Sequence, residues 1–415
     1  MNWQTRACRI AAVVAACLFG GAVVAPAQVG LGQAASPQVD NVQRGVPAGA
    51  FRAFPEIYSG IFYDDNVYRT ASGKHSDSAL DVGGSLKLQS NWNNHALNLA
   101  LVGNRLEYNT AARDSRTTWN VGADGRLDIR RGYDVQGAVS YGTEYEPRNS
   151  PNTIGSIEEP VQFHTSRLRG VASLRPSLLG FEVGASYENY DYDNTDLIGG
   201  GVLNNQDRDM SIASLWGRAA YDFSPGYAVF TRVTYNDRAF TMPLDRFGFD
   251  RDSTGYAVDA GVDMLVTNLV SGNLYAGWFQ QVYDLPLKTI DGFNYGATLT
   301  WYPSPLLTVK LNAARRLFDT TVPGASAANE AVFGLSTDFS VTYTIVVTGT
   351  FDYVDVDYAG STRTDQVRVF GAGITYRMNR YVSVEGRYTY IQRDSSDVFG
   401  RFDSNALLAR LNLHL

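Results

Sequence analysis

The chain has 415 residues and a net charge of −7, with 44% hydrophobic and 19% charged residues, 40 glycines and 25 tyrosines. The acidic balance gives no basic surface for nucleic acid, and the hydrophobic content excludes wholesale disorder. Beyond residue 25 the sequence has no run of about 18 apolar residues, which excludes a protein that spans a membrane with helices.

The first 27 residues predict a cleaved export signal. Arg6 and Arg9 provide a positive start, and residues 10–24 form an apolar stretch. Residues 25–27 read Ala-Pro-Ala, which fits a signal peptidase site. We therefore expect an exported protein whose mature chain begins near Gln28.

Both cysteines, Cys8 and Cys17, lie inside this signal segment. The predicted mature chain therefore has no disulfide, no thiolate chemistry and no cysteine-ligated metal. Cleavage before Cys17, as in a lipoprotein, is the alternative, but it would leave an apolar core of only about seven residues. Residues 28–53 show no periodicity and are rich in Gly, Ala, Pro and Gln, which predicts a flexible periplasmic arm.

From residue 54 to 415 the sequence alternates between apolar and polar residues, which is typical of β-strands with two different faces. In the segment 117–130, Val121 and Leu127 share one parity, whereas Asp124 and Arg126 share the other. About 18 such segments are predicted, at 54–64, 78–90, 95–108, 116–130, 133–146, 164–175, 180–190, 210–223, 226–238, 254–267, 272–284, 290–303, 306–318, 329–341, 344–357, 365–378, 380–393 and 402–415.

The connections between these segments alternate between long and short. Short ones include Arg131-Gly132 and Ser224-Pro225. The long, polar ones are 65–77, 109–115, 147–163, 191–209, 239–253, 319–328 and 394–401. An even strand count with this alternation predicts an all-β fold, a transmembrane antiparallel up-and-down barrel with long outer loops and short periplasmic turns.

Two further observations favour a membrane barrel over a soluble β-sandwich. The segments are about 12 residues long, which suits a tilted crossing of the bilayer, and no linker divides residues 54–415. Aromatic residues such as Tyr108, Trp301 and Tyr381 gather near segment ends, as in the interfacial girdles of such barrels. We expect contact with outer-membrane lipid and lipopolysaccharide, and recognition of the terminal strand 402–415 by the barrel-assembly machinery.

A short motif ends the first predicted strand. It consists of Tyr63, Asp64, Asp65, Asn66, Val67, Tyr68, Arg69 and Thr70. This octet, with the strand layout, resembles the large β-barrel porin-like proteins found with exopolysaccharide gene clusters, including the VpsM-like members. The resemblance implies outer-membrane residence, a role in polysaccharide export or surface assembly with periplasmic export proteins as partners, and no catalytic residues.

A barrel of about 18 strands leaves an aqueous lumen, and its inner face should be polar. We predict that the pore is lined by Arg126, Arg130, Arg167, Arg169, Arg175, Arg218, Arg232, Asp124, Asp128, Asp259, Asp263, Glu385 and Arg387. Arg167, Arg169 and Arg175, with Arg126 and Arg130, form the densest basic stripe and are the first candidates for solute contact. The alternative is that these charges only pair across a water-filled lumen.

Two weaker patterns point to chemistry at the outer rim. His164 and Ser166 have the His-x-Ser spacing of outer-membrane lipid A deacylases and share the lipid-facing parity. The acidic segment 189–196 could hold Ca²⁺ through carboxylates, but a solvated loop is the simpler reading. No pair among the four histidines has metal-ligand spacing, and no cofactor is predicted.

The sequence therefore predicts a non-enzymatic outer-membrane barrel that provides a polar pore for exopolysaccharide or other sugar-like solutes. A long loop, 147–163 or 191–209, could fold inward and narrow the pore. The alternatives are a general diffusion porin, or a non-conducting scaffold that binds polysaccharide-export proteins through the arm 28–53. A lipid-modifying enzyme based on His164 is the remaining alternative.

Overall fold

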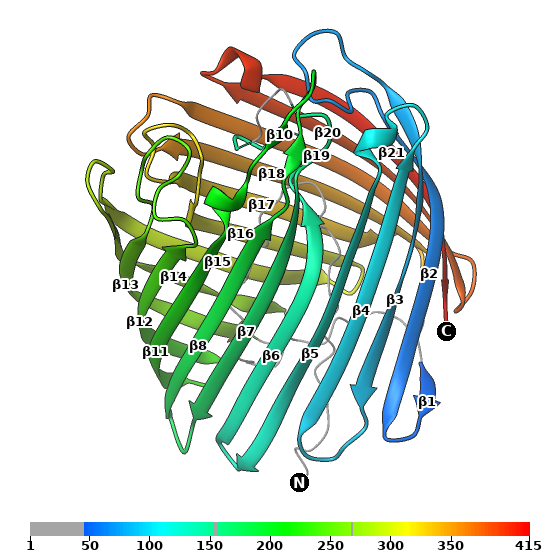
Figure 1. Cartoon of the computed structure of the whole chain (residues 1–415). Helices are drawn as coiled ribbons and strands as arrows, with labels where there is room; N and C mark the ends of the chain where they lie inside the picture. The colour runs from blue at the N-terminus through cyan, green and yellow to red at the C-terminus, as the bar shows by residue number, and fades with distance from the viewer. Residues whose placement is uncertain (1–44, 149, 153–156, 267–268) are drawn as a thin grey trace.

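The computed structural model describes residues 45–148, 150–152, 157–266 and 269–415. The predicted signal segment and most of the predicted arm lie outside the described residues. The described part forms one closed sheet of antiparallel strands (Figure 1). Within it, no helix has the length and apolar character needed to cross a bilayer.

Eighteen strands make the barrel wall, as the sequence predicts. They are β2 (Phe51–Asp64), β3 (Asp77–Ser90), β4 (Ala96–Tyr108), β5 (Arg116–Arg130), β6 (Tyr133–Tyr145), β7 (Gln162–Leu174), β8 (Leu179–Tyr192), β11 (Met210–Ser224), β12 (Tyr227–Phe240), β13 (Ser253–Val266), β14 (Val270–Tyr283), β15 (Ile290–Ser304), β16 (Leu307–Phe318), β17 (Ala328–Ser340), β18 (Ile345–Tyr358), β19 (Thr364–Arg377), β20 (Val382–Ser395) and β21 (Phe402–His414).

The barrel closes where the first of these strands pairs with the last. In this seam, β2 pairs antiparallel with β21 from Glu56 opposite His414 to Asp64 opposite Ala406. Every other wall strand pairs with its neighbours in chain order, so the sheet has no free edge. Closure satisfies the backbone hydrogen bonds that lipid cannot supply.

The long and short connections separate to opposite ends of the barrel (Figure 1). Short elements lie in the long loops: η1 (Ala112–Asp114), β9 (Thr195–Asp196) paired with β10 (Val202–Leu203), η2 (Gln206–Arg208) and η3 (Val398–Gly400). We refer to the two ends as the long-loop end and the short-turn end.

The start of the barrel differs from the predicted boundary at residue 54. β2 begins three residues earlier, at Phe51, and β1 (Val46–Ala48) forms a short hairpin with it. Gly49, with a φ of +64°, lies in the turn between them, where glycine meets no steric penalty. The last residues of the predicted arm are therefore part of the sheet.

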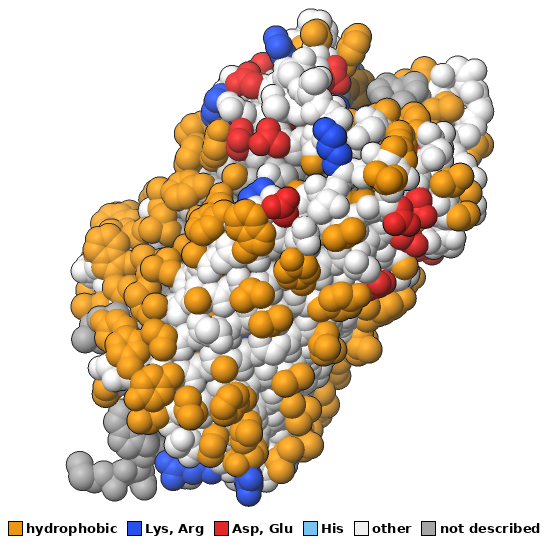
Figure 2. All heavy atoms as spheres, turned by 90° about the vertical axis from the view of Figure 1, so that its left-hand side faces the viewer, with side chains coloured by type: hydrophobic (Ala, Val, Ile, Leu, Met, Phe, Trp, Pro, Cys, Tyr) orange, Lys and Arg blue, Asp and Glu red, His pale blue; other side chains and the backbone are white. Residues whose placement is uncertain are grey.

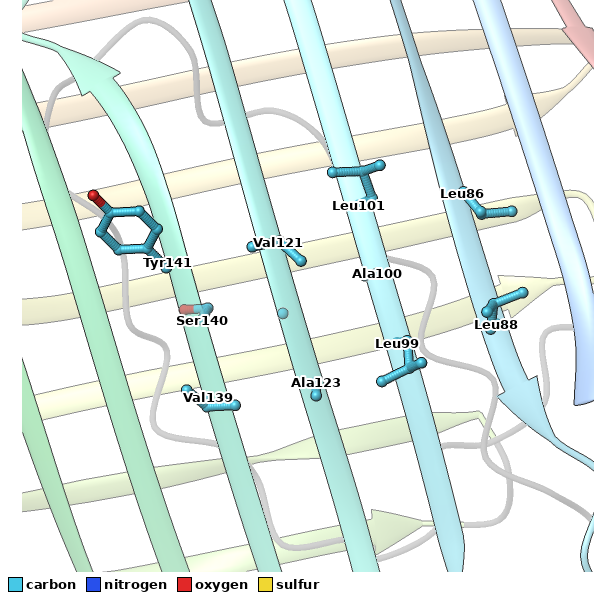
Figure 3. A pocket seen from close by; sticks show the side chains of 11 residues that line it. Leu86, Leu88, Leu99, Ala100, Leu101, Val121, Ala123, Val139, Ser140 and Tyr141 are labelled. Atoms are coloured by element: carbon cyan, nitrogen blue, oxygen red, sulfur yellow. The ribbon is translucent and has the colours of Figure 1, made fainter.

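Apolar side chains cover the outer wall. On β5, Leu127 and Ile129 are 53% and 63% exposed, which in water would be costly for so many large apolar groups. Figure 2 shows apolar side chains over the wall, with charged side chains gathered at its upper end and lower rim. Across β3 to β6 the outer wall carries an apolar groove of about 360 Å³, lined by residues such as Leu99, Val121 and Tyr141 (Figure 3).

Candidate functional site

An ion pair that passes over an intervening strand identifies the face that lines the lumen. Arg410 of β21 lies 2.5 Å from Asp81 of β3, although β2 separates these strands. Gly60 of β2 pairs with both residues, and because it has no side chain it leaves the space in which they meet. Side chains two strands apart converge on the concave side of a closed sheet, so this parity faces inward.

The predicted pore-lining residues occupy this inward parity, with two exceptions at the short-turn end. Arg175 follows β7 directly, and Arg130 follows a register shift at the end of β5, where its guanidinium covers the Tyr133 ring at 3.7 Å. The others lie on β5, β7, β11, β12, β13 and β20: Asp124, Arg126, Asp128, Arg167, Arg169, Arg218, Arg232, Asp259, Asp263, Glu385 and Arg387. Their contact with a solute stays a prediction.

Most of the predicted basic residues are paired with a carboxylate. Arg218 contacts Glu182, at 3.4 Å, and Asp263, and Arg232 lies 2.8 Å from Asp259. The other pairs are Arg126 with Asp128 at 2.9 Å, Arg387 with Glu385 at 2.8 Å, Arg167 with Glu144 at 3.5 Å and Glu188 at 3.8 Å, and Arg175 with Asp222 at 3.8 Å. Pairing therefore compensates much of the positive charge in the basic stripe that the sequence suggested.

Within the described part of the chain, four inward aromatic side chains lie over a glycine and beneath an arginine. The Trp216 indole occupies the space that a Cβ on Gly184 would need, and the Arg169 guanidinium lies 4.6 Å from the ring centroid. The same arrangement recurs for Tyr58 with Gly83 and Arg410 at 4.1 Å, Phe230 with Gly261 and Arg218 at 4.2 Å, and Tyr275 with Gly296 and Arg232 at 4.6 Å.

The sequence pattern alone does not single out these aromatic residues. Their inward parity is readable from the alternation, but the glycine beneath each ring lies on a neighbouring strand, and the arginine on its far side can lie two strands from it. Arg169 on β7 reaches Trp216 on β11 across β8, for example. Only the register of the closed sheet brings the three together.

At the long-loop end, the loop between β6 and β7 reaches the loop between β16 and β17. These loops leave the wall on nearly opposite sides of the ring. The Asn152 side chain accepts hydrogen bonds from the Thr320 hydroxyl at 2.8 Å and the Thr321 N–H at 2.9 Å. Asn152 and Thr320 are both buried, so this contact lies within a packed layer of loops over the lumen. The expectation that the loop 147–163 folds inward agrees with this contact.

Two buried ion pairs attach this loop to its neighbours. The Arg208 guanidinium donates to both oxygens of Glu146, at 2.8 and 3.0 Å, and both side chains are under 10% exposed. The Arg148 guanidinium donates to Asp114 at 2.7 and 3.1 Å. Burial works to lower the pKa of Arg208, but the adjacent Glu146 carboxylate outweighs it and holds that pKa above its ordinary value.

A third ion pair in the same layer joins the loops after β8 and β12. Arg246 donates to the two oxygens of Asp207 at 2.6 and 2.8 Å. Burial works to raise the pKa of Asp207, but the hydrogen bonds from Arg246 outweigh it and hold the pKa below its ordinary value. The loop layer is therefore built from charge pairs that have little contact with water.

The motif of residues 63–70 lies at the seam of the barrel. Asp64 is fully buried and accepts hydrogen bonds from Arg69 at 2.9 Å and from the Ser404 hydroxyl of β21 at 2.7 Å. Asn66 is also fully buried and donates to the backbone oxygen of Asp403 at 2.8 Å. Arg69 has a φ of +56°, a strained value for a non-glycine residue. The motif thus joins the first and last strands at the long-loop end, and the Arg148 guanidinium of the loop layer lies 5.4 Å from the centroid of its Tyr68 ring.

The His164 side chain does not contact Ser166 among the interactions that the structure shows. Its Nδ1 lies 2.9 Å from the Thr143 hydroxyl and its Nε2 lies 3.7 Å from Asp193. Its ring stacks on Tyr141 of the outer wall. A histidine that activates Ser166 would need a hydrogen bond to that hydroxyl, so the geometry gives no support to a lipid-modifying enzyme.

The acidic segment 189–196 also lacks the arrangement that a cation would need. Asp191, Asp193 and Asp196 are exposed, and within the described residues no group of three acidic or histidine side chains is close enough to hold a metal ion. A solvated loop accounts for these carboxylates.

A comparison with protein-family models matches residues 42–415 to the family described as "Putative beta-barrel porin 2". A comparison with curated proteins finds no significant match.

Solved structures with a similar fold include outer-membrane proteins of Pseudomonas aeruginosa. The siderophore receptor PirA is 7% identical, with a TM-score of 0.47, and the match covers 89% of this chain and 81% of that one. OccK2 (OpdF), solved in complex with glucuronate, is 12% identical with a TM-score of 0.45, over 88% of this chain and 98% of that one. Identities this low carry no information about the solute.

Proposed function

The chain belongs to the β-barrel porin family whose model spans residues 42–415, and from this membership we propose that its lumen is a polar path for exopolysaccharide or other sugar-like solutes. The mechanism involves no bond chemistry. Polar lumen groups replace part of the solute's hydration, and the loop layer sets the size limit. The long-loop end would face the exterior and the short-turn end the periplasm.

The observation that carries this proposal is the inner wall. Its charged residues lie in pairs, as at Arg232 and Asp259, which keeps a wide lumen wet without a large net field. Such a wall offers many hydrogen-bond donors and acceptors to a hydroxyl-rich solute. A barrel filled with apolar side chains would offer none.

The partners follow from the two ends and the outer wall. Outer-membrane lipid would cover the apolar belt, including the groove over β3 to β6, and lipopolysaccharide would surround the loops. Periplasmic export proteins would meet the short-turn end, near β1. The signal segment 1–27 would direct export, and the barrel-assembly machinery would recognise β21.

Single-channel recording tests the proposal. The protein is purified from outer membranes, or refolded without residues 1–27, and added to a planar bilayer. We expect stable conductance steps that a polysaccharide on one side reduces. The control is the heat-modifiable shift on a gel, which shows that the barrel is folded. A folded barrel that never conducts would contradict the pore.

The loop layer favours one second function, a non-conducting scaffold for a polysaccharide-export complex. Asn152 and its partners Thr320 and Thr321 cross the lumen, so a stable loop layer could keep the barrel shut. Release of this contact distinguishes the two functions. A pore conducts as wild type and becomes more open when Asn152 is replaced, whereas a scaffold that the other loop contacts, such as Arg208 with Glu146 and Arg246 with Asp207, also keep shut stays silent in both cases.

A further inference from the structure

We propose that Arg169 is an anion-binding group of the lumen, and that the solute it selects is an acidic saccharide with carboxylate groups. This inference rests on the proposed pore function and specifies the chemistry of its solute. Arg169 belongs to the arginine stacks described above, but it differs from the other three in how its charge is compensated.

The other stacked arginines each have a carboxylate partner. Arg218 is paired with Glu182 and Asp263, Arg232 with Asp259, and Arg410 with Asp81. For Arg169 the described residues include no carboxylate oxygen within 4 Å, and its buried Nε has no hydrogen-bond partner. Glu182, the carboxylate that acts on Arg169 from beyond 4 Å, is itself paired with Arg218, so the Arg169 guanidinium can take a carboxylate of a solute as its partner.

The Arg169 guanidinium is held by the stack beneath it. It lies 4.6 Å from the Trp216 ring centroid, and Trp216 in turn rests on Gly184. A guanidinium on an aromatic face keeps its N–H groups in plane and free to form two parallel hydrogen bonds to a carboxylate. Because the stack already restricts the Arg169 side chain, that side chain loses less conformational entropy when a carboxylate binds.

The neighbours of Arg169 suit a sugar that carries an acid. The register places Ser186 of β8 directly opposite Arg169, and Ser214 of β11 directly opposite Ser186. Both serines are partly exposed. On the other side, Ala138 of β6 lies opposite Arg169, and its small side chain leaves room for a solute beside the guanidinium. One guanidinium beside two hydroxyls can bind the carboxylate and ring hydroxyls of one uronic acid unit.

The depth of Arg169 makes it a point that a solute must pass. It lies near the middle of β7, between the loop layer and the short-turn end. Arg167, one inward position closer to the loops, is paired with Glu144 and Glu188 and has less charge to offer. Arg175, at the short-turn end, is paired with Asp222.

The test compares two blockers of matched length in the planar bilayer at low salt. One is an oligomer of galacturonic acid and the other is maltohexaose, which is neutral. We expect the acidic oligomer to block wild-type channels at lower concentration. R169Q should raise its half-blocking concentration about tenfold, the loss expected for one charge-assisted contact. R169K, which keeps the charge and loses the planar fork, should show a smaller rise.

The matched control is R380Q. Arg380 lies in the short turn before β20 and covers Tyr381 at 4.5 Å, so its substitution removes a stacked arginine outside the lumen. The acidic oligomer should block R380Q channels at the same concentration as wild-type channels. The half-blocking concentration of maltohexaose should be the same for all variants. If R169Q channels conduct and the half-blocking concentration of the acidic oligomer is unchanged, the proposed role of Arg169 is overturned. Wild-type channels blocked equally by both oligomers would overturn the acidic solute. A silent folded barrel would instead contradict the pore itself.

Discussion

The side-chain nitrogen of Asn66 donates a 2.8 Å hydrogen bond to the backbone oxygen of Asp403, and this bond ties the first barrel strand to the last. Asn66 is fully buried, and its side-chain oxygen accepts the Thr70 N–H at 3.0 Å. Asp64 and Arg69 complete the same cluster with an ion pair of 2.8 Å. The motif that points to the family is therefore part of how the barrel closes at the long-loop end.

Asn66→Ala should weaken the barrel at this seam. The change leaves the partly buried backbone groups of Thr70 and Asp403 without their side-chain partner, which costs about 1–3 kcal/mol of unfolding free energy. Urea unfolding, followed by loss of the heat-modifiable band, measures it. The control is Asn93→Ala in the exposed turn between β3 and β4, which should unfold like wild type. Equal stability of the two variants would contradict the structural role of the motif.

Gly184→Ala should displace the Trp216 ring from its place over β8. The new Cβ would overlap the indole, and overpacking of this kind costs about 1–3 kcal/mol. The tryptophan fluorescence of the folded protein should change because the surroundings of the Trp216 indole change. Gly170→Ala on β7 is the matched control, because its Cβ would meet no atom within 4 Å. A fluorescence change in Gly170→Ala as large as that in Gly184→Ala would show that the ring does not rest on Gly184.

Asn152→Ala should release the loop that crosses the lumen. The change removes the acceptor of the Thr320 and Thr321 hydrogen bonds, and each 1.4 kcal/mol lost shifts the ratio of open to closed states about tenfold. Single-channel records should show longer openings or more frequent ones. Urea stability of the wall should stay close to wild type, because the strands are untouched. Identical open times in the variant and wild type would show that this contact does not limit the pore.

Asp207→Asn should lower stability at neutral pH by about 1.5–3 kcal/mol, because Arg246 loses its charged partner. The pKa of Asp207 is lowered in the folded state, so its ionised form stabilises the fold above the unfolded pKa. This contribution is lost as the pH falls through the lower, folded pKa. The difference between variant and wild type should therefore be full near pH 7, shrink as the pH falls below the ordinary pKa of 3.8, and vanish below the still lower folded pKa. A difference that is the same at pH 7 and at strongly acid pH would contradict the ion pair.

The wall could be predicted from the sequence because period-2 alternation is a local signal. The predicted strand 116–130 coincides with β5, and Val121 and Asp124 lie on opposite faces as expected. The loop layer could not be predicted in the same way. Asn152 and Thr320 are far apart in the chain, and their contact depends on the closed ring and on loop paths that follow no periodicity.

The lumen was predictable only in part, for a related reason. Alternation places Arg169 and Arg218 on the inner wall, but it does not show which of them has a carboxylate partner. That depends on the register, which brings Asp263 to Arg218 from two strands away and brings Trp216 to Arg169. The basic stripe seen in the sequence is thus largely a set of ion pairs, and of its arginines only Arg169 and, at the short-turn end, Arg130 have no carboxylate oxygen within 4 Å among the described residues.

The conductance of the folded protein in a planar bilayer is the measurement that decides between a pore and a scaffold. A pore should give stable single-channel steps from the heat-modifiable barrel, with a conductance that polysaccharide reduces and openings that Asn152→Ala prolongs. A barrel that is folded by the same gel criterion and stays silent, in wild type and in Asn152→Ala alike, would contradict the pore and leave the scaffold.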